Sequence, residues 1–166
     1  MLNETKSQAT ANNSVLNEVT FEISELMKEV LADQFVLYTK ARNYHWNVTG
    51  PHFFGLHAAF ENIYNGLADD IDNVAERIRV LGFKTPGTMK EFLDISTLNE
   101  EPGKYPNYSE MIQKIIIDFT VVTDKLKAAA YKMQNNLNDE ISAGMFYGLS
   151  EKYQKTVWML RSILEK

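Results

Sequence analysis

Apolar residues recur three, four or seven positions apart over four long stretches of the chain. This spacing places them on one face of an α-helix, which completes a turn about every 3.6 residues. We therefore predict four long amphipathic helices, from Val15 to about Val48, from Phe54 to about Leu81, from Asn107 to about Asn135, and from about Ile141 almost to the C-terminus.

The predicted helices are separated by recognisable stop and start signals. Gly50 and Pro51 end the first helix, because proline disfavours helical geometry at the residue before it. Gly82 follows the second helix as a C-terminal cap. Asn107, with Glu110 three residues later, forms a capping box that starts the third helix.

The connection between the second and third helices is long. It contains Pro86, Gly87, Pro102, Gly103 and Pro106, with a short helix-compatible segment, MKEFLDI, at residues 89–95. Such a connection is a crossover rather than a hairpin. Four long helices with one crossover predict an all-α, ferritin-like four-helix bundle over residues 15–166, preceded by a flexible, polar N-terminal tail at residues 1–14.

The composition narrows the range of functions. A chain of 166 residues, 45% of them hydrophobic, fits one globular domain, and a net charge of -5 argues against a generally basic, nucleic-acid-binding surface. Since there is no cysteine, any metal ligands must be nitrogen or oxygen atoms. The polar N-terminus has no signal-peptide pattern, and no apolar run approaches the length of a membrane span, so we expect a soluble, cytoplasmic protein.

The second predicted helix carries four metal-ligand residue types on one face. His57, Glu61, Asp72 and Glu76 project at about 0°, 40°, 60° and 100° around its axis. The two pairs are 15 residues apart, which is about 22 Å along the axis, so one metal site cannot use both pairs from one helix.

A symmetric dimer resolves this separation. If two copies of the helix cross antiparallel, each His57/Glu61 pair meets the Asp72/Glu76 pair of the partner, which gives two identical intersubunit sites. The midpoint of the four positions lies beside Gly66, whose missing side chain would permit close approach of the two helices.

His45 is placed to complete this cluster, because it lies in step with Tyr38 and Ala41 on the buried stripe of the first helix. Two imidazoles and three carboxylates suit Fe(II), Mn(II) or Zn(II), and iron is the redox-active member of this group. The alternative for a single histidine on an apolar face is a packed core residue, and only the spacing with the other four residues favours a metal ligand.

Three sequence motifs resemble the signature of the Dps miniferritins: NYHWNVTGPHF at residues 43–53, LHxxxE at 56–61 and DNVAERI at 72–78. His45, His57, Asp72 and Glu76 match the metal site of that family, whereas Glu61 stands where the family usually has Asp. The extra methylene of Glu61 keeps a carboxylate but changes its reach, with consequences for metal spacing and affinity. The Glu-x-x-His pairs of larger ferritins are absent.

The resemblance implies an iron-storage ferroxidase. Fe(II) is oxidised at the dimer-interface site, in this family preferentially by hydrogen peroxide, and the ferric mineral is stored inside a hollow dodecamer built from two-fold dimers. It also implies a redox role for Trp46 and acidic pores, for which Asp139 and Glu140 are the candidates. The alternatives are that Trp46 only packs and that the two acids only complement a helix dipole.

The resemblance also raises a different function, a DNA-compacting shell with little ferroxidase activity, because some family members bind DNA through lysine-rich tails. Here the segment before Val15 has only Lys6, and the chain is acidic. We therefore expect weak or no DNA binding.

Overall fold

The protein is an all-α bundle in a computed structural model that describes the backbone of residues 2–165 and the side chains of residues 16–165. Its helices are α1 (Leu2–Asn47), α2 (Phe53–Val80), α3 (Met89–Ile95), α4 (Tyr108–Asn135) and α5 (Glu140–Leu164). The four long helices and the short helix in the crossover confirm the predicted fold. Within the described residues, none of these helices is both long and apolar enough to span a bilayer.

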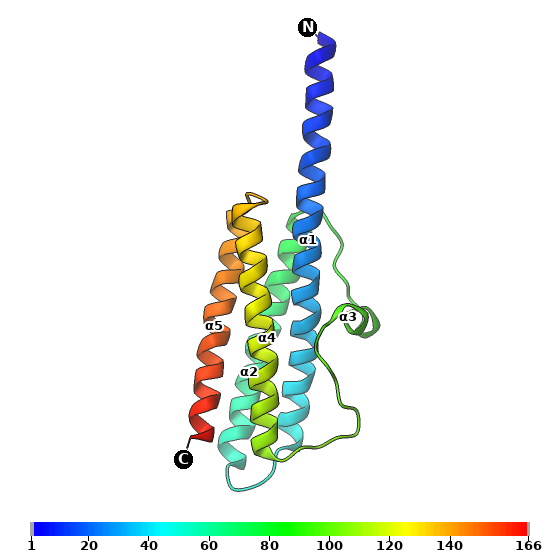
Figure 1. Cartoon of the computed structure of the whole chain (residues 1–166). Coiled ribbons are helices and arrows are strands. Elements are labelled where there is room, and N and C mark those ends of the chain that lie inside the picture. The colour runs from blue at the N-terminus through cyan, green and yellow to red at the C-terminus, as the bar shows by residue number, and fades with distance from the viewer. Residues whose placement is uncertain (1, 166) are drawn as a thin grey trace.

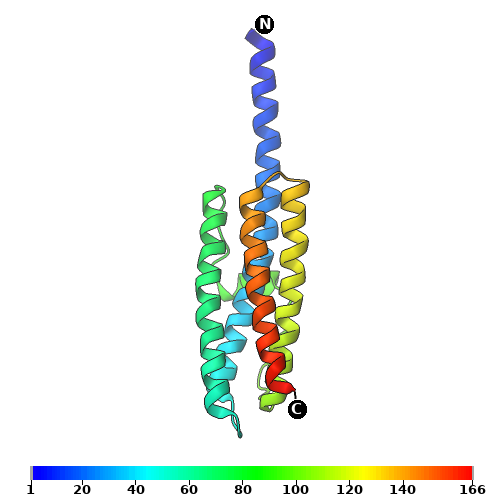
Figure 2. The ribbon, with the colours of Figure 1, turned by 90° about the vertical axis from the view of Figure 1, so that its left-hand side faces the viewer.

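The four long helices lie side by side as two antiparallel pairs, α1 with α2 and α4 with α5 (Figures 1 and 2). The loops that join the members of each pair are short. In contrast, the connection from α2 to α4 runs along the bundle from one end to the other, and α3 lies in it, outside the bundle beside α1 (Figure 1). The predicted crossover is therefore confirmed.

The core lies between the four long helices. The predicted apolar stripes point into it, and each fully buried large side chain contributes roughly 1.5–3 kcal/mol relative to exposure. All four long helices supply such side chains: Met27, Leu37, Phe60, Ile78, Phe119, Leu126, Phe146 and Tyr153. The rings of Phe119 and Tyr153 meet edge to face, 5.0 Å apart.

The ends of the helices follow the signals in the sequence. Gly50, between α1 and α2, has φ +108°, a left-handed conformation that glycine adopts without strain. Gly82 has φ +94° just after α2, where its amide donates to Arg79 O and the next amide donates to Ile78 O, the pattern of a Schellman cap. The Asn107/Glu110 capping box at the start of α4 is confirmed.

The first helix is longer than predicted. It begins at Leu2 rather than Val15, and its N-terminal part extends beyond the other helices (Figure 1). No proline or glycine lies between Met1 and Val15, so no residue there interrupts the backbone hydrogen bonds of the helix. The flexibility of residues 1–14 stays a prediction.

Asp33 of α1 fixes the crossover to the bundle. Its fully buried carboxylate accepts hydrogen bonds from Ser96 Oγ (2.7 Å) and the Thr97 amide (2.7 Å), and it pairs with Lys125 of α4. Next to it, the ring of Phe92 on α3 stacks on Phe35 of α1 at 3.9 Å. These contacts hold α3 against α1.

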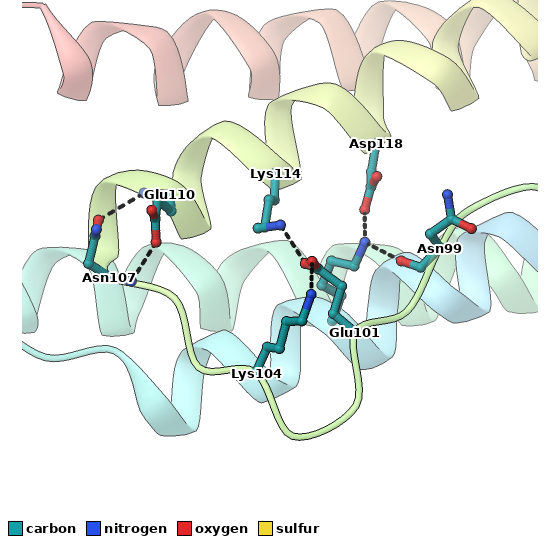
Figure 3. A network of polar contacts seen from close by, with 8 residues as sticks. Asn99, Glu101, Lys104, Asn107, Glu110, Lys114 and Asp118 are labelled. Atoms are coloured by element: carbon teal, nitrogen blue, oxygen red, sulfur yellow. Dashed lines mark hydrogen bonds and ion pairs between the residues drawn. The ribbon is translucent and has the colours of Figure 1, made fainter.

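A second polar network fixes the later part of the crossover (Figure 3). Lys40 donates to the carbonyl of Asn99 (2.9 Å) and pairs with the buried Asp118 of α4. Burial raises the pKa of Asp118, and the hydrogen bond and charge of Lys40 oppose that rise. Glu101 pairs with Lys114 of α4, and this hydrogen bond lowers the pKa of Glu101.

Candidate metal centre

Two histidines from neighbouring helices lie face to face at the end of the bundle where a short loop joins α1 to α2. His45 is in the last turn of α1 and His57 is near the start of α2. Their rings stack 3.7 Å apart at an angle of 26°. Nδ1 of His45 donates to the carbonyl of His57 (2.8 Å), and Nδ1 of His57 donates to the carbonyl of His45 (2.9 Å).

These reciprocal hydrogen bonds decide which nitrogen of each ring can bind a metal. A backbone carbonyl only accepts, so each Nδ1 must carry the hydrogen. In the neutral imidazole the lone pair is then on Nε2, the arrangement found in metal-binding histidines that donate their other N–H to a carbonyl. The pair therefore offers two oriented nitrogen ligands on adjacent helices.

Glu61 lies one turn after His57 on α2, and its side chain is exposed. The hydroxyl of Tyr64 donates to Glu61 Oε1 at 3.4 Å, and the Tyr64 ring meets the His45 ring edge to face at 5.3 Å. Burial and then the negative charge of Glu61 raise the pKa of Tyr64. The sequence analysis missed Tyr64, although its spacing of three residues from Glu61 puts the two on one helical face.

Arg42 organises the aromatic residues beside the histidines. Its guanidinium lies 4.8 Å from the ring centre of Tyr64 and 5.2 Å from that of Trp46, and it donates to the Tyr38 hydroxyl at 2.7 Å. Trp46 is 64% exposed. This cluster was also missed, because α1 and α2 contribute to it together and the contact of Arg42 with Tyr64 crosses between them.

Asp72 and Glu76 lie four to five turns after His57 on α2, and both are exposed. Neither carboxylate has a hydrogen-bond or ion-pair partner within the part of the chain that the structure describes. In the same part, no three histidine, aspartate or glutamate side chains are grouped closely enough to hold a metal ion. One chain therefore brings His45 and His57 together, one turn from Glu61. It keeps Asp72 and Glu76 apart from these three residues, as the axial distance along α2 predicts. That the two groups meet across a dimer stays a prediction.

Gly66 has a neighbour within its own chain, and the close helix approach predicted there across a dimer stays a prediction. The space beside its Cα is filled from within the chain, because Lys152 of α5 donates to the Gly66 carbonyl (3.1 Å) and its Nζ lies 3.5 Å from where a Cβ would be. On α2, Gly66 also lies about 130° around the axis from the centre of the His57–Glu76 face. Within the chain, a Cβ at Gly66 would make an ordinary van der Waals contact with the Lys152 side chain.

Asp139 is occupied by local contacts. As the N-cap of α5 it accepts from the amide of Ser142 (3.0 Å), and it pairs with Arg77 of α2 (3.2 Å). Burial alone would raise the pKa of Asp139, but the bonds from Ser142 and the charge of Arg77 outweigh it and hold that pKa below its ordinary value. This favours the helix-terminus interpretation for Asp139, whereas Glu140 is exposed.

The comparisons with known proteins agree with this fold. The ferritin-like domain family matches residues 24–166. The chain is 38% identical to the DNA protection during starvation protein 2 of Bacillus anthracis over 146 residues, which cover 87% of this chain and 98% of that protein.

Two solved structures are also similar. The Dps protein from Bacillus brevis has a TM-score of 0.85 and 32% identity, covering 89% of this chain and 98% of that one. The Dps protein of Vibrio cholerae O1, described as a member of a broad superfamily of ferritin-like diiron-carboxylate proteins, has a TM-score of 0.85 and 26% identity, covering 90% and 92% of the two chains.

The bundle, its long crossover and the histidine pair thus define a ferritin-like protein. More narrowly, the chain belongs to the Dps family of miniferritins. Iron binding and DNA protection are the activities for which this family is known.

Proposed function

We propose that the protein oxidises Fe(II) at intersubunit sites and stores the ferric product as mineral inside a hollow shell, which protects the cell against oxidative stress. The ligands at each site are His45, His57 and Glu61 of one chain and Asp72 and Glu76 of its dimer mate. The shell is a dodecamer of two-fold dimers, located in the cytoplasm.

One observation carries this proposal. The reciprocal Nδ1–carbonyl bonds of His45 and His57 leave both Nε2 atoms as lone-pair donors on adjacent helices. Such bonds are the usual support of metal-binding histidines, because they fix the tautomer and the ring orientation. The exposed carboxylates of Asp72 and Glu76 supply oxygen ligands that favour the higher charge of Fe(III).

The chemistry of the site is the transfer of one electron from each of two Fe(II) ions. We propose hydrogen peroxide as the oxidant: two Fe(II) supply two electrons, the O–O bond breaks, and with two protons the products are two Fe(III) and two water molecules. The protein holds the two metal ions close together with anionic ligands. This removes both Fe(II) and peroxide, the reactants that otherwise yield hydroxyl radicals.

The first test measures peroxide-driven Fe(II) oxidation by the near-ultraviolet absorbance of ferric products. His57→Ala and Asp72→Ala should each lower the initial rate by tenfold or more. The matched control is His52→Ala, because His52 is an exposed residue just before α2 whose ring meets that of Tyr108 edge to face at 5.4 Å. Equal rates in His57→Ala and His52→Ala would rule out the proposed site.

The second test asks whether the site is shared between chains. In a co-refolded equal mixture of His57→Ala and Asp72→Ala chains, half of the dimers are mixed, and each mixed dimer has one intact site out of two. The mixture should therefore recover about a quarter of the wild-type rate, although each variant alone keeps about a tenth of that rate or less. A site within one chain would give no recovery, which would contradict the dimer.

The name of the Bacillus anthracis relative supports a second candidate function, DNA protection by direct binding. We propose that this chain binds DNA weakly or not at all, since its net charge is -5 and only Lys6 precedes Val15. A mobility shift of duplex DNA at low salt by the assembled protein would contradict this.

A further inference from the structure

The carboxylate of Glu61 is held at one oxygen and open at the other. Glu61 is exposed on α2, and Tyr64 lies three residues later on the same face of that helix. The Tyr64 hydroxyl donates to Glu61 Oε1 at 3.4 Å, and Oε2 has no hydrogen-bond partner among the described residues. One oxygen of this carboxylate therefore stays available to a metal ion while the other is in contact with Tyr64.

Three side chains of α1 hold the Tyr64 ring in place. The His45 ring meets it edge to face at 5.3 Å, and the Tyr38 ring does so at 6.1 Å. The guanidinium of Arg42 lies 4.8 Å from the centre of the same ring and donates to the Tyr38 hydroxyl at 2.7 Å. The Tyr64 ring cannot turn away from Glu61 without losing these contacts with the neighbouring helix.

A fixed hydroxyl matters to Glu61 because this glutamate is exposed. A long, flexible side chain loses its rotamer freedom when it binds a metal ion, and that loss opposes binding. Hydrogen bonds from outer groups orient a ligating carboxylate in advance and so reduce the cost. Tyr64 is placed to supply such a bond, since its own ring is already fixed by α1.

The length of the contact is consistent with this role. Hydroxyl–oxygen hydrogen bonds are usually about 2.7–2.8 Å long, so the contact at 3.4 Å is a weak one. Hydrogen bonds that support a binding site are often long and shorten when the ligand fixes the side chain. The alternative is that Tyr64 only packs against α1, in which case its ring would matter and its hydroxyl would not.

We propose that Tyr64 is a positioning residue of the metal centre: its hydroxyl orients the Glu61 carboxylate, and α1 orients the hydroxyl. This rests on the proposed function, because it takes Glu61 as an iron ligand. Tyr64 itself neither binds the metal ion nor supplies an electron. It contributes to the affinity for Fe(II), and not to the rate of oxidation once Fe(II) is bound.

The first test is calorimetric titration of the assembled protein with Co(II), which takes nitrogen and oxygen ligands as Fe(II) does. Tyr64→Phe keeps the ring and its packing against α1 but removes the hydroxyl, and should weaken Co(II) binding about tenfold. The matched control is Tyr131→Phe, which removes the same atom from a ring that is 63% exposed on α4 and should keep the wild-type affinity. Wild-type affinity in Tyr64→Phe would overturn the proposal.

A double variant shows whether Tyr64 acts through Glu61. In Glu61→Ala, the ligands His45, His57, Asp72 and Glu76 remain, so weaker Co(II) binding can still be measured. Adding Tyr64→Phe to this variant should change the affinity less than about twofold, because the carboxylate that it positions is gone. Equal losses from Tyr64→Phe with and without Glu61 would show a packing effect and overturn the proposal.

The kinetics of Fe(II) oxidation separate positioning from electron transfer. In Tyr64→Phe, the Fe(II) concentration that gives half of the maximal rate should rise about tenfold, while the maximal rate stays within about twofold of wild type. A lower maximal rate at an unchanged half-saturating concentration would make Tyr64 a participant in the oxidation and overturn the positioning role. Failure of the proposed function looks different, because His57→Ala and Glu61→Ala would then both keep the wild-type affinity for Co(II).

Discussion

Asp33 gives the sharpest test of what holds the crossover in place. In Asp33→Ala, four donors lose their acceptor: the Ser96 hydroxyl, the amide and the hydroxyl of Thr97, and the Lys125 ammonium. Ser96 is half-buried and Thr97 exposed, so water can replace Asp33 there. The losses at the Ser96 hydroxyl and the Thr97 amide cost about 1 kcal/mol each, and the longer bonds of the exposed Thr97 hydroxyl add little. The side chain of Lys125 is 19% exposed, and its unpaired charge adds about 1–2 kcal/mol.

The expected loss in free energy of unfolding is therefore about 3–4 kcal/mol, within the usual range for breaking a buried ion pair. Urea unfolding followed by circular dichroism, at one fixed protein concentration, measures it. Hydrogen exchange should also accelerate most in residues 89–98. The matched control is Asp94→Ala, which removes an exposed pair with Lys90 and should cost less than about 0.5 kcal/mol. A difference between the two variants below about 1 kcal/mol would refute this reasoning.

Three further predictions follow from single residues. Asp139→Ala should lower the free energy of unfolding by about 1–2 kcal/mol at neutral pH, because the helix cap and the ion pair with Arg77 are lost. The pKa of Asp139 is lowered in the folded protein, so urea titrations should show this difference shrinking as the pH falls below 3.8. Gly66→Ala should raise the free energy of unfolding by about 0.5–1 kcal/mol in thermal unfolding, because alanine favours the helix more than glycine does and the new Cβ only contacts Lys152. A weaker dimer in sedimentation would contradict the view that Gly66 contacts only its own chain. Glu61→Asp should keep Fe(II) oxidation but change the affinity for Fe(II), measured by Fe(II) titration, because the carboxylate remains with a shorter reach. Glu61→Ala should lower the rate of Fe(II) oxidation. Equal behaviour of the two variants would argue against Glu61 as a ligand.

Much of the fold follows from the local sequence. The apolar spacing predicts all four long helices, and Gly50, Gly82 and Asn107 mark three of their ends, because left-handed turns and capping boxes depend on residues within a few positions of each other. The start of α1 was missed, since a polar helix that leaves the bundle carries no apolar stripe. The shared face of His57, Glu61, Asp72 and Glu76 also follows from sequence, as helical geometry alone sets it.

Tertiary structure decided what lies between the helices. No spacing predicts that His45 and His57 exchange hydrogen bonds with each other's carbonyls, or that Tyr64 joins Glu61 to His45. The sequence placed Gly66 correctly on α2, yet its partner is Lys152, 86 residues further along the chain. Periodicity fixes the direction of a side chain around its own helix, whereas the group that it meets depends on how neighbouring helices are rotated and shifted as the whole core packs.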